Sequence, residues 1–184
     1  MRTRYLAAAT FGLALVAASS ATPLVNAATP AVVSAPNPIG CASPVGRDDS
    51  AAALLRRFGR NARKETVPGP EGETFEALVL YPRDSRRRIE VTFADARMLR
   101  PASVTLRSGS SVWSMAGLRL GDSLDRVATR NGRDFTLSGF EWDYGGYVTD
   151  WQGGALDDIA PGCRTTVRFN IPPDVQMADA ILGE

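Results

Sequence analysis

Two stretches of this 184-residue chain align without a gap, and each has the pattern of a short capped helix. Residues 49–60 and 122–133 both begin with Asp-Ser, and both reach Gly-Arg after eight further residues. Asp and Ser accept hydrogen bonds from the free amides of a first helical turn, and Gly ends a helix by adopting a left-handed conformation. Apolar residues three and four positions apart complete the pattern. We therefore predict one short helix in each stretch.

Segments with the composition of β-strands follow each predicted helix. The first helix precedes residues 75–82, 87–94 and 101–109, and the second precedes residues 134–144, 147–152 and 163–170. This order predicts an α+β fold with an antiparallel sheet and two short capped helices. We interpret residues 48–109 and 121–170 as two related halves, an internal repeat. A chance match between two capped helices is the alternative.

The first 27 residues have the pattern of a secretory signal peptide. Arg2 and Arg4 precede an apolar run that is too short to cross a bilayer as a helix, and small residues follow as far as Ala27. We expect cleavage after Ala27, export to the periplasm or out of the cell, and no transmembrane segment in the mature chain. A buried N-terminal helix is the alternative.

The remaining chain divides by composition into two parts. Residues 28–46 are rich in Ala, Pro, Ser and Gly and are expected to form a flexible lead-in, whereas residues 47–184 are expected to form a single α+β domain. Without Arg2 and Arg4 the chain has 19 basic and 20 acidic residues. A nearly neutral chain is not attracted to nucleic acid by its overall charge, so we expect no nucleic-acid partner.

The chain has two cysteines, Cys41 and Cys163, and no histidine. Two cysteines in an exported chain usually pair, so we predict a disulfide that joins the lead-in to the last predicted strand. A lipid anchor at Cys41 and a reactive or metal-binding thiol pair are the alternatives. The absence of histidine excludes Ser-His-Asp and Cys-His catalysis and most zinc sites. We expect no cofactor.

Residues 139–154 contain five aromatic rings and three carboxylates. Gly145-Gly146 suits a two-residue hairpin turn, because both positions of such a turn can need positive φ. Counting outward from this turn places three pairs on one side of the hairpin: Tyr144 with Tyr147, Trp142 with Thr149, and Phe140 with Trp151. We expect the rings to fill a core. The alternative is an exposed platform for stacking a ligand, made of Trp142, Tyr144, Tyr147 and Trp151.

The same turn places the acidic residues on the other side of the hairpin, where Glu141 faces Asp150. The simplest interpretation is a solvated pair or a pair bridged by arginine. One alternative is a Ca²⁺ site formed by Glu141, Asp143 and Asp150. Another is a pair of catalytic carboxylates, Glu141 and Asp150, in a hydrolase that acts on a saccharide, because facing residues have about the spacing that a retaining glycosidase needs.

A run of three arginines, Arg86-Arg87-Arg88, follows the turn predicted at residues 82–85. These side chains could meet phosphate or sulfate groups on a cell-envelope polymer. The simpler interpretation is a solvated end of a hairpin.

Three features of the second half, Gly121-Asp122-Ser123, Gly132 and Trp142-Asp143-Tyr144, resemble exported bacterial proteins with helix-then-hairpin repeats. The β-lactamase inhibitor protein type and the BamE-type outer-membrane assembly lipoproteins are similar in this respect. The resemblance covers about 35 residues in each half, and it implies binding rather than catalysis. We therefore expect an exported, non-catalytic binding protein of the cell envelope or extracellular space, whose partner is a protein or polymer there. A saccharide hydrolase and a purely structural envelope protein are the alternatives.

Overall fold

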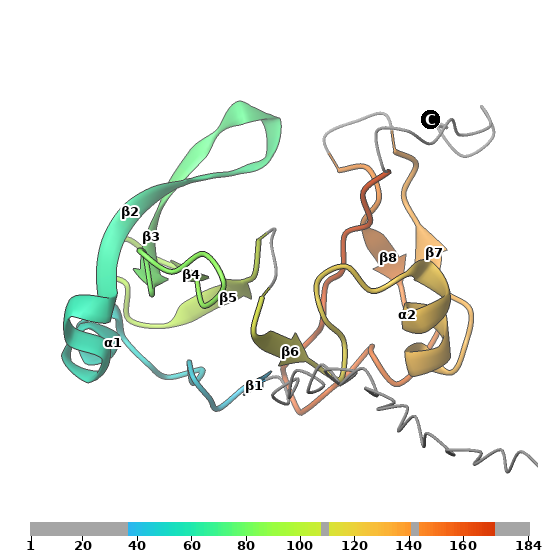
Figure 1. The fold of residues 1–184 in the computed structure, drawn as a ribbon, viewed down its shortest axis with the longest axis horizontal. Helices are drawn as coiled ribbons and strands as arrows, with labels where there is room; N and C mark the ends of the chain where they lie inside the picture. Colours follow the sequence, from blue (N-terminus) through green and yellow to red (C-terminus); the bar gives the residue numbers. More distant parts are fainter. Residues whose placement is uncertain (1–36, 108–110, 141–143, 172–184) are drawn as a thin grey trace, which may run out of the picture. The chain divides into compact units, whose positions relative to one another are not determined.

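The computed structural model describes residues 37–107, 111–140 and 144–171, all of which belong to one unit of the chain (Figure 1). The fold is α+β, with two helices among the described residues, an antiparallel sheet and one disulfide, as predicted. The elements in chain order are β1 (Asn37–Ile39), α1 (Ala51–Phe58), the 3-10 turn η1 (Gly59–Asn61), β2 (Ala62–Pro68), the 3-10 turn η2 (Pro70–Gly72), β3 (Thr74–Leu80), β4 (Ile89–Phe93), β5 (Pro101–Thr105), β6 (Trp113–Met115), α2 (Leu124–Asn131), β7 (Thr136–Leu137) and β8 (Val148–Asp150).

Both helices begin and end where their capping residues predict. The hydroxyl of Ser50 accepts from the amide of Ala53 at 3.2 Å, and the hydroxyl of Ser123 accepts from the amide of Arg126 at 3.3 Å. Gly132 ends α2 with φ of 73°, a conformation that costs little only for a residue without a Cβ. Each helix thus has its own N-terminal cap of the same kind, a serine hydroxyl. The internal repeat itself stays a prediction.

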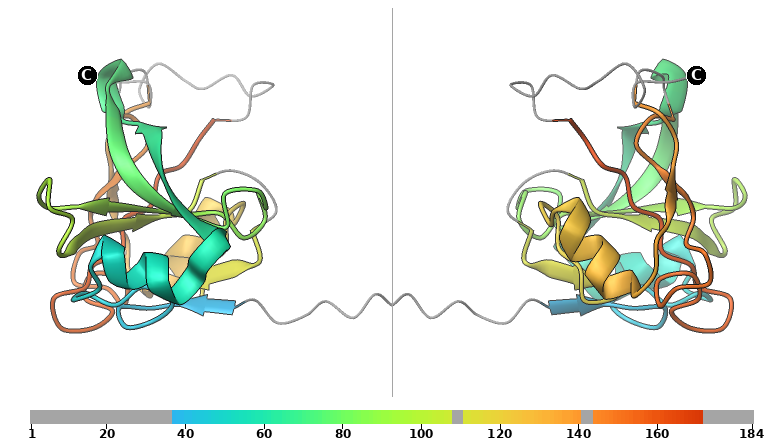
Figure 2. Two further views of the ribbon diagram at one scale, coloured as in Figure 1. Left: turned by 90° about the vertical axis from the view of Figure 1, so that its left-hand side faces the viewer. Right: turned by 90° about the vertical axis from the view of Figure 1, so that its right-hand side faces the viewer.

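Four antiparallel strands form the main sheet, in the order β2-β3-β4-β5. The sequence predicts β3, β4 and β5 but not β2, whose residues 63–65 are all charged. Charged side chains and a terminal proline are typical of a strand at the edge of a sheet, where they oppose pairing with other chains. The β2–β3 ribbon continues past β4, because β4 pairs only with the last three residues of β3 (Figure 2).

One face of this sheet packs against α1 to form the first hydrophobic core. Leu54 of α1 is fully buried with four aliphatic side chains of β3 and β4: Leu78, Leu80, Ile89 and Val91. Burying one such side chain contributes about 1.5–3 kcal/mol. This core therefore combines regular strands with mainly aliphatic residues, and Trp113 is its buried aromatic side chain among the described residues.

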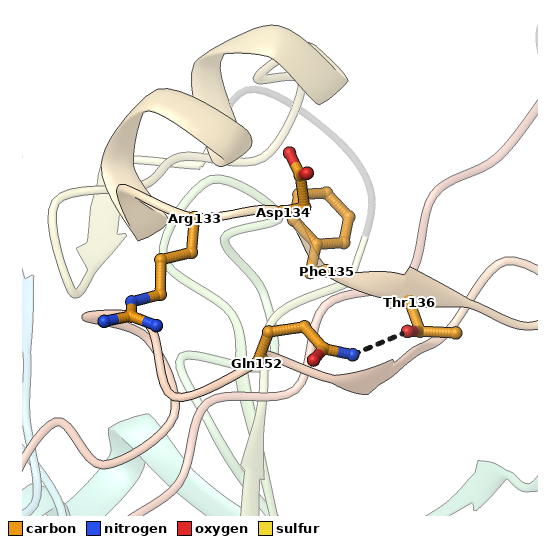
Figure 3. Close-up of a pocket in the computed structure, with 5 residues that line it drawn as sticks. All are labelled: Arg133, Asp134, Phe135, Thr136 and Gln152. Atoms are coloured by element: carbon orange, nitrogen blue, oxygen red, sulfur yellow. Dashed lines mark hydrogen bonds between the residues drawn. The ribbon is translucent and has the colours of Figure 1, made fainter.

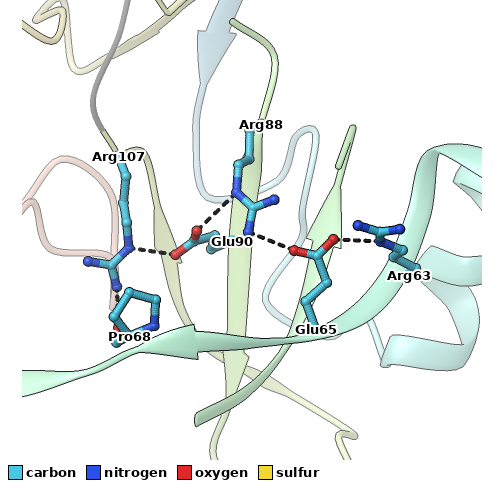
Figure 4. Close-up of polar contacts among 6 residues, drawn as sticks. All are labelled: Arg63, Glu65, Pro68, Arg88, Glu90 and Arg107. Carbon is cyan, nitrogen blue, oxygen red and sulfur yellow. Dashed lines mark hydrogen bonds and ion pairs between the residues drawn. The ribbon is translucent and has the colours of Figure 1, made fainter. Parts of the chain in front are cut away.

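The opposite face of the sheet carries a chain of alternating charges (Figure 4). Glu65 of β2 contacts Arg63 and Arg88, and the buried Glu90 of β4 contacts Arg88 at 3.1 Å and Arg107 at 2.6 Å. Burial raises the pKa of Glu65, but the hydrogen bonds from Arg88 and Arg63 outweigh it, so this pKa lies below its usual value. Because Arg107 also donates to the carbonyl of Pro68, these contacts fasten the ribbon to β4.

Residues 37–46 differ from the flexible lead-in that the sequence predicts. β1 pairs in parallel with β6, and both Ile39 and Val45 belong to the first core. The composition is poor in apolar residues, but two well-placed side chains and one strand partner are enough to fix this short segment. The predicted disulfide is present, with the Cα atoms of Cys41 and Cys163 6.1 Å apart. The structured part of the chain therefore begins before Arg47.

The second core lies around α2. Val127 of the helix packs with Leu118, Val148, Trp151 and Leu156. Phe135, Leu137 and Phe169 lie against this group and are only partly buried. Short strands thus replace the regular sheet of the first core, and Trp151 is the buried aromatic side chain of this second core.

The register of the β7–β8 hairpin differs from the prediction. Thr136 lies opposite Asp150, and Leu137 lies opposite Val148, with an irregularity between the two pairs. The amide of Ser138 donates to the carbonyl of Tyr147 at 2.9 Å. The predicted pairs of Tyr144 with Tyr147 and Phe140 with Trp151 are therefore wrong, while the pair of Trp142 with Thr149 involves a residue outside the described ranges.

The diglycine is required for a different reason from the one expected. Gly146 has φ of 76°, whereas Gly145 does not have positive φ. The two residues therefore do not form the predicted two-residue hairpin turn in which both positions have positive φ. A Cβ at Gly145 would lie 2.5 Å from the carbonyl oxygen of Phe140, and one at Gly146 would lie 2.2 Å from that of Phe169. Close backbone approach from two sides therefore excludes larger residues.

A third segment fixes this register from outside the hairpin. The amide of Val148 donates to the carbonyl of Val167 at 2.9 Å, and the amide of Phe169 donates to the carbonyl of Gly146 at 2.8 Å. Residues 167–169 thus pair with residues 146–148, within the region of the strand predicted at 163–170. Counting outward from the turn considers only the two strands of the hairpin, so it cannot predict the effect of these backbone bonds on the register.

Candidate functional site

The aromatic residues proposed for ligand stacking do not form one platform. Trp151 is buried in the second core, and its indole donates to the carbonyl of Thr165 at 2.9 Å. The guanidinium of Arg168 lies 5.2 Å from the ring centre of Tyr147, and Tyr144 is exposed. Trp142 lies outside the described residues. The interpretation as a core is therefore confirmed for Trp151, and the four-ring platform loses that member.

The acidic residues are also not arranged as the two-residue turn predicts. Asp150 lies opposite Thr136, and its side chain accepts from the amide of Gln152 at 2.7 Å. Glu141 and Asp143 lie outside the described residues. Thr136 occupies the position opposite Asp150, where the two-residue turn would place Glu141, and the catalytic pair and the Ca²⁺ site that depend on Glu141 stay predictions. Within the described ranges, no three potential metal ligands lie together.

The arginine run is divided among three environments. The guanidinium of Arg87 lies 3.8 Å from the ring centre of Tyr81, and the backbone carbonyl of Arg87 accepts from the indole of Trp113. Arg88 belongs to the chain of charges on the sheet, and the amide of Arg86 donates to Asp84. The side chains of Arg87 and Arg88 therefore have separate partners, a tyrosine ring and the carboxylates of the sheet.

A hollow of about 550 Å³ lies where α2 leads into β7, and we call it the α2–β7 hollow (Figure 3). Five residues line it: Arg133, Asp134, Phe135, Thr136 and Gln152. The first four follow one another directly after the glycine that ends α2, and Gln152 comes from the segment after β8. The hollow is open to the surface, and Phe135 alone among these residues is partly buried.

One buried side chain holds both walls of this hollow. The side-chain nitrogen of Asn131, the last residue of α2, donates to the carbonyls of Arg133 and Trp151, each at 3.0 Å. Its side-chain oxygen accepts from the amide of Leu156 at 3.2 Å. Buried polar groups are costly unless they are paired, and the two carbonyls and one amide satisfy this amide group. Asn131 therefore fixes the spacing between the two lining segments.

Gly154 makes this arrangement possible. A Cβ at this position would lie 2.1 Å from the side-chain oxygen of Asn131, so a larger residue would displace the asparagine. The amide of Ala155, the next residue, donates to the backbone carbonyl of Asn131 at 2.9 Å. The sequence from Trp151 to Leu156 is thus wrapped around the end of α2.

Phe135 provides a ring of fixed orientation at the hollow. Its ring stacks on Phe169, with the centroids 6.0 Å apart and the planes 5° from parallel. Trp151 lies against it with a centroid distance of 5.3 Å. Aromatic pairs in these arrangements attract one another beyond the effect of burial alone. The ring is therefore held in place whether or not a ligand is bound.

The polar groups of the hollow include both donors and acceptors. The side-chain nitrogen of Gln152 donates to the hydroxyl of Thr136 at 3.2 Å, which links the two walls (Figure 3). Arg133 supplies donors and Asp134 supplies acceptors, whereas an amide and a hydroxyl supply both. The formal charges of the lining residues cancel.

A second hollow, of about 300 Å³, is a weaker candidate. Ser114, Gly117, Arg119, Asp122 and Arg126 line it. The side chain of Asp122 already accepts from the amide of Arg119 at 2.8 Å, and the lining contains no aromatic ring. We therefore take the α2–β7 hollow as the candidate site.

Arg133, Phe135 and Asn131 are not among the site residues that the sequence predicts. The sequence predicts Asn131 as the end of a helix and Phe135 as one residue of a strand. The signal that could have identified them is an asparagine at the end of a helix, followed some twenty residues later by a diglycine. Only the fold brings the two together.

Comparisons with protein-family models, with curated proteins and with solved structures found no match to this chain. In the part of the chain that the structure describes, neither helix has the length and apolar character needed to cross a bilayer.

Proposed function

We propose that this chain is an exported, non-catalytic binding protein and that its ligand occupies the α2–β7 hollow. The observation that carries the proposal is the pairing of Asn131 with both walls of the hollow. Ligand sites are generally concave, largely formed before the ligand binds, and supplied with a few fixed polar groups around an apolar surface. Phe135 supplies the apolar surface here, and the exposed polar residues surround it.

Export is part of this proposal. The signal-like residues 1–27 support it, and so does the disulfide between Cys41 and Cys163, since such bonds persist mainly outside the cytoplasm. The ligand would then be a polymer or protein of the cell envelope or of the extracellular space. The chain would reach it in the periplasm or after secretion.

Binding accounts for the hollow better than hydrolysis does. Glycoside hydrolysis by the common mechanism needs two carboxyl groups on either side of the bond that breaks. Asp134 is the one carboxylate among the described residues that line the hollow. The alternative of a hydrolase was based on Glu141 facing Asp150, and Thr136 lies opposite Asp150 instead.

Capture of envelope material by the purified, exported chain tests the proposed function. The chain is immobilised and exposed to the cell envelope and culture supernatant of its own organism, and the retained carbohydrate and protein are measured. We expect the double variant Arg133→Ala/Gln152→Ala to retain much less material, because both residues line the hollow and both are exposed.

The control for this experiment is a second double variant, Arg83→Ala/Asn61→Ala. It also removes one exposed arginine and one exposed side-chain amide, but away from the hollow. Capture by this control should equal that of the unmodified chain. Equal capture by all three proteins, or no capture by any of them, would contradict the proposed function and favour a purely structural role.

A further inference from the structure

We propose that the ligand of the α2–β7 hollow is a neutral oligosaccharide segment; this inference rests on the proposed function. The hollow offers one ring of fixed orientation and a set of exposed polar groups around it. A sugar ring has the complementary surface, with an apolar face of C–H groups and hydroxyl groups at its edge. The ring of Phe135 can pack against such a face, as apolar surfaces do.

The polar groups of the hollow match hydroxyl groups better than ions. A hydroxyl both donates and accepts, so it can pair with the donors of Arg133, with the acceptors of Asp134, and with either function of Thr136 or Gln152. An anionic ligand would be attracted by Arg133 but repelled by Asp134, and a cationic ligand would meet the reverse. The cancelling charges therefore favour a ligand without net charge.

An extended peptide fits this region less well. Peptides that are recognised through their backbone usually add a strand to a free sheet edge. The hollow presents side chains instead, and the amide of Val148 in β8 is already bonded to the carbonyl of Val167. A peptide would have to bind through its side chains alone, without the regular hydrogen bonds of a sheet.

The contacts of Asn131 prepare the hollow for such a ligand. Sugars offer many weak contacts, so an ordered site has an advantage over one that must be organised during binding. Asn131 holds the segments that contain Arg133 and Gln152, while Phe169 and Trp151 hold Phe135. The backbone of both walls and the ring of Phe135 are thus in position before a ligand arrives.

Isothermal titration calorimetry with defined oligosaccharides tests this inference on the purified, exported chain. The neutral probes are cellohexaose, chitohexaose, maltohexaose, xylohexaose and mannohexaose. A galacturonic acid hexamer serves as the anionic probe, and a neutral decapeptide serves as the peptide probe. We expect saturable binding of at least one neutral hexasaccharide and weaker binding or none of the anionic and peptide probes.

Variants locate the binding in the hollow. Gln152→Ala and Thr136→Ala remove exposed side chains and should each weaken the interaction several-fold, and Phe135→Ala should weaken it at least about tenfold. Because Phe135 also packs against Trp151, its variant is checked for an unchanged circular dichroism spectrum. Arg83→Ala, an exposed substitution away from the hollow, should bind as the unmodified chain does.

The outcomes separate this inference from the proposed function. If none of the neutral hexasaccharides binds, or if their binding is unchanged in the hollow variants, the sugar assignment is overturned. Tighter binding of the anionic probe or the peptide at the hollow would also overturn it. In each of these cases the proposed function still stands if the variant Arg133→Ala/Gln152→Ala captures less envelope material than the unmodified chain. If the two proteins capture equal amounts, both the proposed function and the sugar assignment are refuted.

Discussion

The two cores of this molecule use similar helices but different partners. α1 packs on a four-stranded sheet whose buried side chains are mainly aliphatic, and its neighbouring strands pair over three to seven residues. α2 packs on a hairpin with only two ladder pairs, on aromatic side chains and on a segment that adds single backbone bonds. Capping signals thus specify a helix in both halves, whereas the strands and side chains around each helix differ and shape its surroundings.

The difference extends to polar groups. In the first half, charges lie on the face of the sheet away from α1 and fasten the β2–β3 ribbon. In the second half, the neutral side chain of Asn131 lies inside the structure and holds two loops. The first arrangement strengthens a scaffold, and the second shapes a surface. We therefore expect stability to depend mainly on the first half, and the proposed recognition site lies in the second.

Truncation of the first core should give the largest effect. Leu54→Ala removes a fully buried side chain from the α1–sheet contact, and we expect the free energy of unfolding to fall by about 3 kcal/mol. Urea denaturation followed by circular dichroism measures this. Leu99→Ala, at a position 46% exposed, is the control and should change stability by less than about 0.5 kcal/mol. If both variants are equally stable, the first core is not organised around Leu54.

Truncation of the buried Asn131 should reduce the stability less than Leu54→Ala does, but it should reduce the affinity of the hollow more. Asn131→Ala leaves the carbonyls of Arg133 and Trp151 and the amide of Leu156 without their partner, so we expect a loss of about 2 kcal/mol. The affinity of the hollow should also fall, whereas Leu54→Ala should leave it unchanged while the protein is folded. Urea denaturation and calorimetry on the same samples measure both effects.

Asn61→Ala is the matched control for the buried asparagine, because the side chain of Asn61 is exposed. Its stability and affinity should stay within error of the unmodified chain. Should Asn131→Ala bind as tightly as this control, the positioning role of Asn131 would be refuted, even if its stability is lower.

The helix caps test what the two halves have in common. Ser50→Ala and Ser123→Ala each remove one cap hydrogen bond of similar length, so each should cost about 1 kcal/mol. Denaturation curves of the two variants measure the costs directly. Costs that differ by more than about 1 kcal/mol would show that the two helices are not equivalent, which would weaken the interpretation as an internal repeat.

Acid should weaken the first half by a smaller amount. Hydrogen bonds from Arg88 and Arg63 outweigh the burial of Glu65 and hold its pKa below its usual value of 4.5, and the bond from Arg57, opposed by burial, lowers that of Asp49 below 3.8. A lowered carboxyl pKa adds stability that is fully present above the unfolded value and is lost as the pH falls through the folded value. We expect a loss below about 1 kcal/mol for each group, since both pairs are partly exposed.

Denaturation of the unmodified chain and of Glu65→Gln between pH 6 and pH 3 measures this effect. The variant should be less stable at pH 6 and should lose less stability on acidification, because it lacks the ionisable group. Parallel curves for the two proteins would show that Glu65 does not contribute to the pH dependence.

The parts of the fold that follow local rules could be predicted from the sequence. Ser50, Ser123 and Gly132 act within one helical turn of themselves. β3 ends in an apolar run, residues 77–80, and β4 alternates apolar and polar residues, so both kinds of element follow from local patterns. The charges of residues 63–65 hid β2, because two of their partners come from other segments: Glu76 of β3 pairs with Lys64, and Arg88, 23 positions away, pairs with Glu65. Local patterns carry no information about such partners.

The candidate site could not be predicted for a similar reason. The register of the hairpin depends on its backbone bonds to residues 167–169. The diglycine is required because the carbonyls of Phe140 and Phe169 lie too close for a Cβ, and not because of a turn type. Asn131 finds its partners at Trp151 and Leu156, twenty and twenty-five positions along the chain. The sequence predicts a core for the rings of 139–154, with a stacking platform as the alternative, whereas the candidate site is a hollow beside a ring outside that stretch, Phe135.

The most direct test of the central claim is a map of amide chemical shifts. The ¹⁵N-labelled chain is titrated with the neutral hexasaccharide that binds best by calorimetry, and two-dimensional NMR spectra are recorded at each addition. The account predicts that the amides of Phe135, Thr136 and Gln152 shift progressively and saturate, while those of β4 stay in place. Largest shifts on the β2–β3 ribbon or elsewhere, with the amides of the α2–β7 hollow unchanged, would contradict it.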